Sequence, residues 1–212
     1  MRDFKNLKIT EHPLVQSKLS MLRDKNTGNK EFRELVKEIA IFVCYEATKD
    51  APLTLKEIET PLEERINVNI TERKYALIPI LRAGLGMVEG IAEMLPTAKI
   101  GHIGIFRDEK TRFPIEYHSK LPVDVSEREV LVIEPMIATG GTILTALKTL
   151  KKRGCERIKI LSVLVSPESA ERIYSEYQDV YIYAAALDKG LNDKGYIVPG
   201  LGDAGDRLFG TK

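Results

Sequence analysis

The chain has 212 residues, 43% of them hydrophobic and 30% charged, which is enough to form one globular domain with a full hydrophobic core. Its 32 basic and 31 acidic residues leave a formal charge of +1, which argues against a protein that recruits nucleic acid or a membrane surface through its overall field. The first ten residues lack the apolar segment of a signal peptide, and no apolar run reaches the ~20 residues of a membrane helix, so we expect a cytoplasmic protein.

The N-terminal third begins with two predicted helices. Apolar residues recur at helical spacing over 12–24 and 29–49, and the turn residues between them make Asn29 a candidate N-cap for the second helix. Two short extended pieces follow at 53–59 and 66–70. Cys44 and Cys155 have no CxxC or histidine partner at metal-ligand spacing, so we expect two ordinary buried thiols.

From Tyr75 onward, short apolar runs alternate with helical patterns, which is typical of parallel strands connected by helices. The predicted strands are 76–81, 100–106, 130–134, 158–165 and 180–185. The predicted helices are 84–94, 141–153 and 167–177, with Gly154 as a left-handed stop for the second. We therefore expect an α/β core over 71–186 within a single domain, 1–212, preceded by the helices and extended segment of 1–70.

Two segments interrupt this alternation. One is polar, covers about 107–123 and contains Pro114 and Pro122; the other is the tail, 187–212, with six glycines. Long irregular segments of this kind are usually functional flaps or disordered regions.

The stretch 130–142 joins a buried strand, the carboxylate of Glu134, a loop of small residues and the start of a helix. Such a loop can present successive backbone N–H groups and a helix N-terminus to a phosphate, with the hydroxyls of Thr139 and Thr142 as further donors. Neither a Walker A sequence nor GxGxxG is present, which favours a monophosphate. Glu134, at the carboxyl end of the strand, would reach sugar hydroxyls, so the pattern indicates ribose 5-phosphate. The alternative is that Glu134 caps the helix or meets solvent and Thr-Gly-Gly is only a tight turn.

Arginines follow two other predicted strands. Arg82, in a loop with Gly84 and Gly86, could clamp a diphosphate through charge-assisted bonds, although a lone arginine at a strand end is more often a surface ion-pair partner. Arg107 begins a charged triplet, a pattern that is usually a solvated loop start. His102 and His118 have no evident base or metal partner, and we interpret both as structural.

The tail from Gly195 to Thr211 combines glycines with Tyr, Ile, Val, Leu and Phe. Glycine is costly unless an unusual dihedral angle or a close approach requires it, so backbone is expected to lie close to a ligand here. A flat pyrimidine, with its alternating carbonyl and N–H groups, suits exposed main-chain groups. A flexible terminus is the alternative, but fraying tails rarely carry so many large apolar residues.

Taken together, these motifs carry a specific resemblance. The strand, acid and Ala-Thr-Gly-Gly-Thr sequence is similar to the motif of type I phosphoribosyltransferases that binds PRPP (5-phosphoribosyl-1-diphosphate). Most of that superfamily has two adjacent acids there, often aspartates, whereas Glu134-Pro135-Met136 resembles the uracil branch. The tail sequence Tyr-Ile-Val-Pro-Gly-Leu-Gly-Asp-Ala-Gly-Asp-Arg also resembles uracil phosphoribosyltransferases, and the likeness covers nearly the whole chain.

The resemblance implies the type I phosphoribosyltransferase fold, an open, mainly parallel twisted sheet flanked by helices. It adds N-terminal helices, a protruding β-arm at about 107–123 that makes dimer contacts and covers the site, and a C-terminal hood that binds the base. The implied activity is the transfer of the phosphoribosyl group of PRPP to N1 of uracil, which gives UMP and pyrophosphate in pyrimidine salvage. It further implies Mg²⁺ carried by PRPP, with no dedicated protein ligands, a homo-oligomer such as a dimer or tetramer, and a possible GTP effector.

The resemblance also assigns residues. Those implied to bind PRPP are Arg82, Arg107, Glu134, Pro135, Met136, Ile137, Ala138, Thr139, Gly140, Gly141, Thr142 and Asp203. Those implied to bind uracil are Ile197, Gly202, Asp203 and Ala204. Arg82 would offset leaving-group charge, Glu134 would orient the ribose, and Asp203 is the nearest candidate for a general base. Two alternatives stay open: an RNA-binding pyrimidine regulator with the same fold, and a nucleotide-binding module without turnover.

Overall fold

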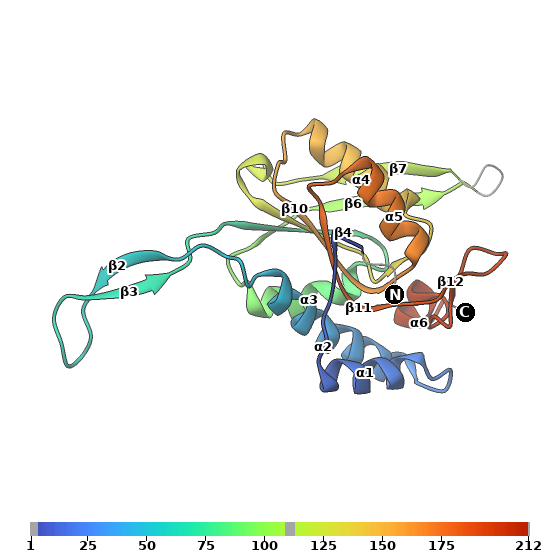
Figure 1. Cartoon of the computed structure of the whole chain (residues 1–212), viewed down its shortest axis with the longest axis horizontal. Helices are drawn as coiled ribbons and strands as arrows, with labels where there is room; N and C mark the ends of the chain where they lie inside the picture. Colours follow the sequence, from blue (N-terminus) through green and yellow to red (C-terminus); the bar gives the residue numbers. More distant parts are fainter. Residues whose placement is uncertain (1–3, 109–112, 212) are drawn as a thin grey trace.

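The computed structural model describes residues 4–108 and 113–211, which form an open, twisted sheet with helices on both faces (Figure 1). The strands of this sheet are β1 (Leu7–Ile9), β4 (Tyr75–Leu81), β5 (Lys99–Ile100), β6 (His102–Arg107), β7 (Pro114–Lys120), β8 (Glu129–Ile133), β9 (Met136–Ile137), β10 (Ile158–Val165) and β11 (Tyr181–Leu187). They run in the order β1-β11-β10-β8-β4-β6-β7, with β5 beside β4 and β9 beside β10. All pairs are parallel except β6 with β7. The predicted α/β fold is therefore confirmed.

Helices cover the two faces of the sheet. Those of the described residues are α1 (Pro13–Arg23), α2 (Asn29–Ala47), α3 (Leu85–Met94), α4 (Gly141–Lys152), α5 (Pro167–Glu176) and α6 (Ala204–Phe209), with a 3-10 turn η1 (Val125–Glu127) before β8. In Figure 1, α1, α2 and α3 lie on one side of the sheet and α4 and α5 on the other. Every side chain of β8 and β10 is buried, which explains their mostly apolar sequences; the polar residues among them are Glu129, Lys159 and Ser162. No helix of the described residues is long and apolar enough to cross a membrane.

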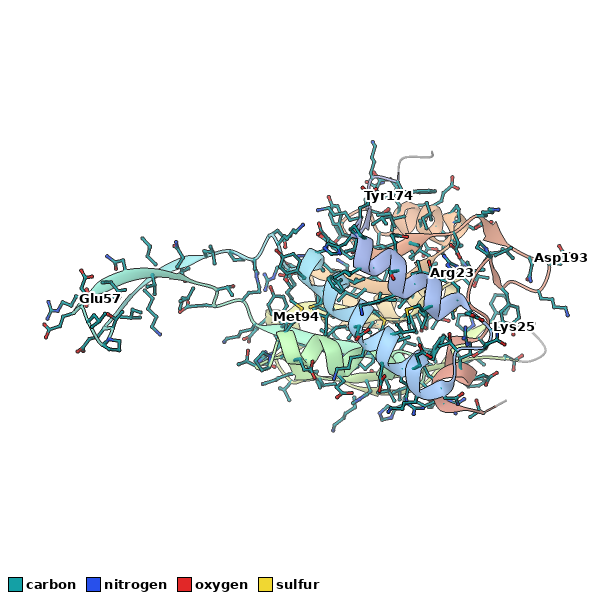
Figure 2. The ribbon with its side chains drawn as sticks, turned by 90° about the horizontal axis from the view of Figure 1, so that it is seen from below. Arg23, Lys25, Glu57, Met94, Tyr174 and Asp193 are labelled. Carbon is teal, nitrogen blue, oxygen red and sulfur yellow. The ribbon has the colours of Figure 1, made fainter. Side chains whose placement is uncertain are left out.

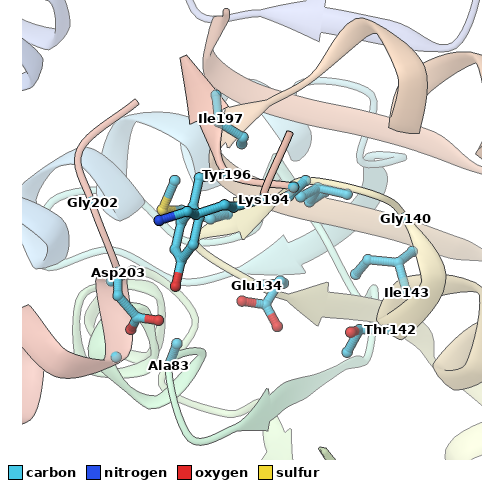
Figure 3. Close-up of a pocket in the computed structure, with 16 residues that line it drawn as sticks. Ala83, Glu134, Gly140, Thr142, Ile143, Lys194, Tyr196, Ile197, Gly202 and Asp203 are labelled. Carbon is cyan, nitrogen blue, oxygen red and sulfur yellow. The ribbon is translucent and has the colours of Figure 1, made fainter. Parts of the chain in front are cut away.

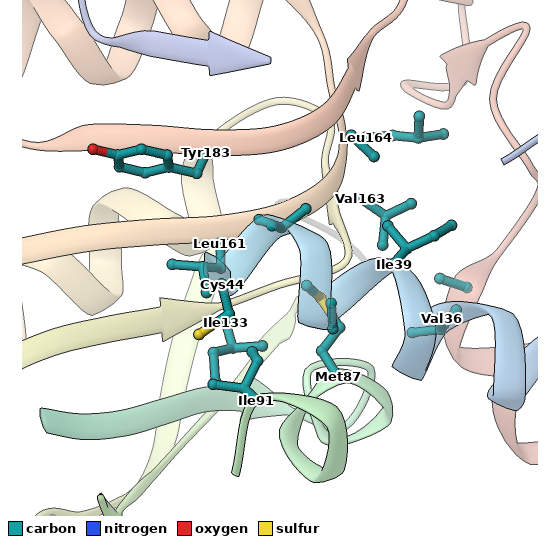
Figure 4. Close-up of a cluster of buried hydrophobic side chains, with 14 of the residues drawn as sticks. Val36, Ile39, Cys44, Met87, Ile91, Ile133, Leu161, Val163, Leu164 and Tyr183 are labelled. Atoms are coloured by element: carbon teal, nitrogen blue, oxygen red, sulfur yellow. The ribbon is translucent and has the colours of Figure 1, made fainter. Parts of the chain in front are cut away.

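The hydrophobic core on the α2 face shows why this helix forms. Its buried residues recur every three to four positions, so one face of the helix packs on the sheet. Figure 4 shows Ile39 and Cys44 of α2 near Met87 and Ile91 of α3, over the strands. Cys44 and Cys155 are both buried free thiols, as predicted.

The element boundaries match the prediction within a few residues, with three differences. Asn29 is the first helical residue and not the N-cap of α2, a position that Gly28 occupies without a side-chain cap. The predicted strand 100–106 is divided into β5 and β6 at Gly101. Glu134 lies just beyond β8. Gly154 follows α4 with φ +78°, which confirms the left-handed stop.

The arm is the main correction. β2 (Thr54–Ile58) and β3 (Ile66–Ile70), predicted only as separate extended pieces, pair as an antiparallel hairpin that projects from the body (Figure 1). Figure 2 shows Glu57 on this hairpin, at the opposite end of the molecule from Asp193. The segment 107–123, where we expected the arm, instead supplies β7 at the sheet edge, apart from 109–112, which lie outside the described residues.

The tail forms a hood beside the carboxyl ends of the strands. Strands β12 (Gly190–Leu191) and β13 (Ile197–Val198) pair antiparallel, and α6 follows. Residues 187–211 are thus ordered into a hairpin, a turn and a short helix. The alternative of a flexible terminus is wrong for this segment.

Candidate active site

A cavity of about 340 Å³ lies between the carboxyl ends of β4 and β8 and the hood (Figure 3). The predicted site residues that line it are Glu134, Met136, Ile137, Ala138, Gly140, Thr142, Ile197, Gly202, Asp203 and Ala204. Two predicted groups that are far apart in the sequence, the loop after β8 and the tail, therefore face one cavity. Carboxyl ends of parallel strands are the usual location of ligands in open α/β sheets.

The loop after β8 is held with its carbonyl oxygens turned toward β10 and α5. The bonds are Val163 N–H and Leu164 N–H to Pro135 O (3.0 Å each), Ser169 Oγ to Ile137 O (2.8 Å), Ser166 Oγ to Ala138 O (2.5 Å) and Arg172 Nη1 to Thr139 O (3.1 Å). Because these carbonyls are held on the far side, the other face of the loop can present N–H groups to the cavity. This arrangement of the backbone is compatible with the predicted phosphate cradle.

The cradle ends at the N-terminus of α4. Gly140, the N-cap, has φ +76°, a left-handed conformation that glycine adopts without a steric penalty. The first N–H groups of any α-helix have no acceptor within the helix, and they carry the positive end of the helix dipole. Thr142 lies in this first turn and lines the cavity. The geometry suits a phosphate.

Two carboxylates enter the cavity from opposite walls. Glu134 follows β8, where its N–H donates to Leu161 O (3.1 Å), and Figure 3 shows its carboxylate in the same space as Thr142. Asp203 comes from the hood, where its Oδ1 accepts from Asp206 N–H (2.9 Å) and caps α6. A ligand in the cavity could thus contact Glu134 through its hydroxyl groups on one side and Asp203 through a base on the other.

The loop after β4 forms a further wall. Ala83 lines the cavity, and Arg82 is exposed next to it, with its guanidinium 5.6 Å from the ring centre of Phe209 in α6. The peptide between Leu81 and Arg82 is cis. A Cβ at Gly84 would lie 2.4 Å from Ile133 O, so only glycine lets this loop pack directly on β8. The role of Arg82 at a diphosphate stays a prediction, as does the alternative of an ion-pair partner.

Not all predicted residues line the cavity. Pro135 and Gly141 belong to the cradle backbone, and Thr139 bonds through its carbonyl to Arg172. Arg107 ends β6, opposite Pro114, and its side chain lies outside the described part of the chain. The role of Arg107 therefore stays a prediction.

Six residues that line the cavity were not predicted as site residues: Ala83, Ile143, Lys194, Gly195, Tyr196 and Gly205. Lys194 and Tyr196, from the connection between β12 and β13, bring polar side chains to it. In Figure 3 the Tyr196 hydroxyl points between Glu134 and Asp203. Tyr196 stands in the tail motif, but only Ile197 and the turn from Gly202 to Ala204 had been assigned a role. A cation and an aromatic ring beside a glycine turn were the available signal.

The side-chain oxygens of the site determine which metal ions it could contact. Among the described residues, no group of three or more His, Cys, Asp or Glu side chains is placed to hold a metal ion. Glu134 and Asp203 supply hard oxygen donors of the kind that Mg²⁺ prefers, directly or through its waters. Such a donor set fits an ion that enters with a phosphorylated substrate.

Comparison with known proteins identifies the relatives of this chain. The model of the family "Uracil phosphoribosyltransferase" matches residues 9–211. The uracil phosphoribosyltransferase of Thermoanaerobacter sp. (strain X514) is 52% identical over 209 residues, which cover 99% of this chain and 100% of that protein. The uracil phosphoribosyltransferase of Bacillus cytotoxicus is 55% identical over 206 residues, 97% of this chain and 99% of the other.

Solved structures agree on the fold. The AQ2163 protein from Aquifex aeolicus superimposes with a TM-score of 0.92 at 37% identity, covering 97% of this chain and 99% of that one. A hypoxanthine-guanine phosphoribosyltransferase from Bacillus anthracis gives a TM-score of 0.51 at 14% identity, over 76% and 80% of the two chains. The second likeness concerns the fold alone.

Proposed function

The chain belongs to the uracil phosphoribosyltransferase family, and from that premise we propose how its residues divide the work of the reaction. The reaction transfers the 5-phosphoribosyl group of PRPP to N1 of uracil, giving UMP and pyrophosphate, and serves pyrimidine salvage. The bond between ribose C1 and the diphosphate oxygen breaks, the bond from C1 to N1 forms, and N1 loses its proton. Family membership over the whole chain favours this enzyme over an RNA-binding regulator or a non-catalytic module.

The observation that carries the proposal is that the cradle and the hood face a single cavity. We assign the 5-phosphate to the N–H groups of the loop from Ile137 to Thr142, because the loop carbonyls are bonded away from the cavity. Glu134 would accept hydrogen bonds from the ribose hydroxyls. Positive charge develops on the ribose when the diphosphate departs, so a fixed carboxylate nearby also has an electrostatic role.

The diphosphate would lie near the loop after β4. Arg82 supplies the charge there, and Arg107 is assigned to the same role from its place at the end of β6. Mg²⁺ would enter bound to PRPP, screening the charge of the diphosphate, with Glu134 and Asp203 as the available hard donors for its waters. These residues hold the leaving group while the ribose moves toward the base.

Uracil would lie against the hood. Ile197, Gly202 and Ala204 are assigned to it through main-chain groups, which match the alternating donors and acceptors of a pyrimidine edge. Asp203 sits at the centre of this turn and is exposed to the cavity, so it is the candidate to take the N1 proton. Asp203→Asn tests that role: an unchanged turnover number with an unchanged pH profile would refute it.

The test of the whole assignment is UMP formation from uracil, PRPP and Mg²⁺, run beside orotate, hypoxanthine and adenine. We expect turnover with uracil alone. In Glu134→Gln, kcat/KM should fall ~10-fold to 100-fold, the equivalent of about 1.5–3 kcal/mol for hydrogen bonds to a charged group. Glu127→Gln is the control, because Glu127 lies in the turn before β8, at the amino ends of the strands. Equal rates for the two variants would contradict the role of Glu134.

We also propose a homo-oligomer, either a dimer or a tetramer, in which the hairpin β2–β3 meets a second copy. The hairpin exposes large apolar side chains, with Leu53 at 63%, Leu55 at 73% and Leu62 at 97% exposure. Apolar groups exposed together on a projecting hairpin are typical of an interaction surface. Sedimentation of the wild type and of Leu55→Lys over a range of concentrations tests this assignment, and identical masses would contradict it.

Two further implications of the family resemblance need their own measurements. GTP as an effector is tested by rate curves at fixed uracil and PRPP with and without GTP. A cytoplasmic location is tested by fractionation of cells that produce the protein.

A further inference from the structure

The turn assigned to uracil is preceded by a glycine whose two backbone groups are both held by side chains. Gly200 N–H donates to Asp188 Oδ2 (2.9 Å), and Gly200 O accepts from Arg23 Nη1 (2.7 Å). Arg23 also grips Asp188 with both nitrogens, at 2.8 Å and 2.5 Å. Asp188 is only 8% exposed. A peptide of the tail is thereby tied to the C-terminal end of α1.

The next peptide is held by a second arginine. Arg207 Nη1 donates to Leu201 O (2.8 Å) and to Leu22 O (2.8 Å), and its Nη2 donates to Asp24 O (2.6 Å). Its guanidinium lies 4.3 Å from the ring centre of Phe32 in α2. Arg207 therefore joins the hood to the turn between α1 and α2 through backbone carbonyls and a ring face.

These bonds fix a segment whose glycines leave its backbone flexible. Gly200 (φ +63°) and Gly202 (φ +85°) flank Leu201, and glycine in this region gives the chain more freedom than any other residue. A Cβ at Gly200 would lie 2.1 Å from Ile197 O, so the freedom cannot be removed by a larger residue. Side-chain bonds from outside the segment are the remaining way to fix its shape.

We propose that Arg23, Asp188 and Arg207 are positioning residues that fix the turn from Gly202 to Ala204 and thereby set the affinity of the enzyme for uracil. None of the three lines the cavity, so they act through the turn and do not touch substrate. The inference rests on the proposed function, in which this turn recognises the base. It does not involve the cradle, which is held separately by serines of α5.

The hood and the cradle are anchored separately, so the proposal predicts different effects on the KM for uracil and the KM for PRPP. A displacement of the turn of about 1 Å can cost up to ~100-fold in rate, because recognition of a small base depends on placement. The cradle would keep its geometry, so the KM for PRPP should change little. A residue that only stabilised the fold would not separate the two Michaelis constants.

The variants are conservative, so that they retain folded protein. Asp188→Asn keeps the shape and an acceptor for Gly200 N–H but weakens the pair with Arg23, while Arg23→Lys and Arg207→Lys keep the charge but lose the planar fork. Asp124 and Arg128 form a matched control. They make the same two-bond pair (3.0 Å and 2.8 Å), and Arg128 also donates to a backbone carbonyl, that of Tyr75 (3.2 Å), but at the amino ends of the strands.

The experiment measures KM for uracil and for PRPP, kcat, and urea unfolding for each variant. We expect ~10-fold to 100-fold higher KM for uracil in Asp188→Asn, Arg23→Lys and Arg207→Lys, with the KM for PRPP within about twofold. Asp124→Asn and Arg128→Lys should lose stability and leave both constants unchanged. Folded variants in which both constants rise together, or neither does, would overturn the proposal. Absence of uracil turnover in the wild type would instead overturn the proposed function.

Discussion

Ser166 offers the sharpest test of how the phosphate cradle is supported. It is fully buried at the N-terminus of α5, where its Oγ donates to Ala138 O (2.5 Å) and accepts from Ser169 N–H (3.0 Å). One hydroxyl therefore caps a helix and holds the cradle. Ser166→Ala removes these two bonds, together with the contact between Ser166 Oγ and Ser169 Oγ (3.1 Å), without removing any large side chain, so the effect can be attributed to the hydroxyl.

The magnitude follows from the two bonds. Loss of an N-cap serine costs about 0.5–2 kcal/mol, and a buried carbonyl left without its partner costs about 1–3 kcal/mol. We expect Ser166→Ala to lower the free energy of unfolding by ~2–4 kcal/mol and to raise the KM for PRPP, because the loop amides lose their fixed orientation. The KM for uracil should change much less, since the hood is anchored to α1 and α2.

Urea unfolding at fixed protein concentration and initial rates at varied PRPP measure the two effects. Ser175→Ala is the control, because Ser175 lies on the same helix, is exposed, and donates only within it, to Arg172 O (2.8 Å). If Ser166→Ala were as stable as Ser175→Ala, or had the same KM for PRPP as the wild type, the account of the cradle would be wrong.

Three further predictions concern other parts of the structure. Burial raises the pKa of the Cys44 thiol to about 12, so a thiol reagent at pH 8 should react with neither cysteine until urea unfolds the chain; rapid labelling of native protein would contradict this. Lys159→Met should lower stability by about 3 kcal/mol, because it removes one of the two cations that pair with the buried Glu129, the one at 2.7 Å, and leaves only Arg73 at 3.2 Å; urea unfolding measures the loss. Gly84→Ala should give little folded protein in a circular dichroism and solubility assay, since its Cβ would lie 2.4 Å from Ile133 O; a folded variant of wild-type stability would refute the packing argument.

The pair of Lys159 with Asp50 (2.5 Å) adds a pH dependence whose sign is set by both partners. Burial works against the charge of Asp50, but the hydrogen bond from Lys159 holds the Asp50 pKa below its ordinary value of 3.8, so its contribution is present above that pH and lost as pH falls. Burial likewise works against the charge of Lys159, but Asp50 and Glu129 hold the Lys159 pKa above 10.5, so that contribution is present below that value and lost at more alkaline pH. Urea unfolding of the wild type between pH 3 and 7 should show more loss than the same measurement on Asp50→Asn.

The core elements could be predicted because buried positions are occupied by apolar residues in a recognisable pattern. The strands β8 and β10 are buried on both faces, and α2 is buried on one, so apolar runs and helical spacing were sufficient. The place of the loop after β8 at the cavity was predictable for a related reason: a carboxylate and small residues at a strand end have few purely structural uses. The glycine tail was recognised through its likeness to known proteins, since composition alone also allowed a flexible terminus.

What could not be predicted depends on contacts between distant segments. The hairpin β2–β3 was missed as an arm because its apolar side chains are exposed, so their pattern does not report a sheet face. Asn29 was misplaced by one residue because Gly28 begins α2 without any side-chain cap. Arg23 and Asp188 are 165 residues apart, and nothing in either local sequence indicates the partner. The hood could therefore be recognised from its sequence motif, but the side chains that anchor it could not be predicted.

The amino ends and the carboxyl ends of the parallel strands carry different kinds of polar group, and this difference has a mechanistic consequence. At the amino ends of β8 and β10, buried side chains form ion pairs with one another, and Glu129 contacts both Arg73 (3.2 Å) and Lys159 (2.7 Å). At the carboxyl ends, the carbonyls of the loop after β8 are satisfied by α5, which directs loop N–H groups and Glu134 to the cavity. Groups that pair internally stabilise the fold, whereas groups that line a cavity can also meet a ligand. Substitutions at the amino ends should therefore change the free energy of unfolding and leave the Michaelis constants unchanged, because the proposed function places the substrates at the carboxyl ends.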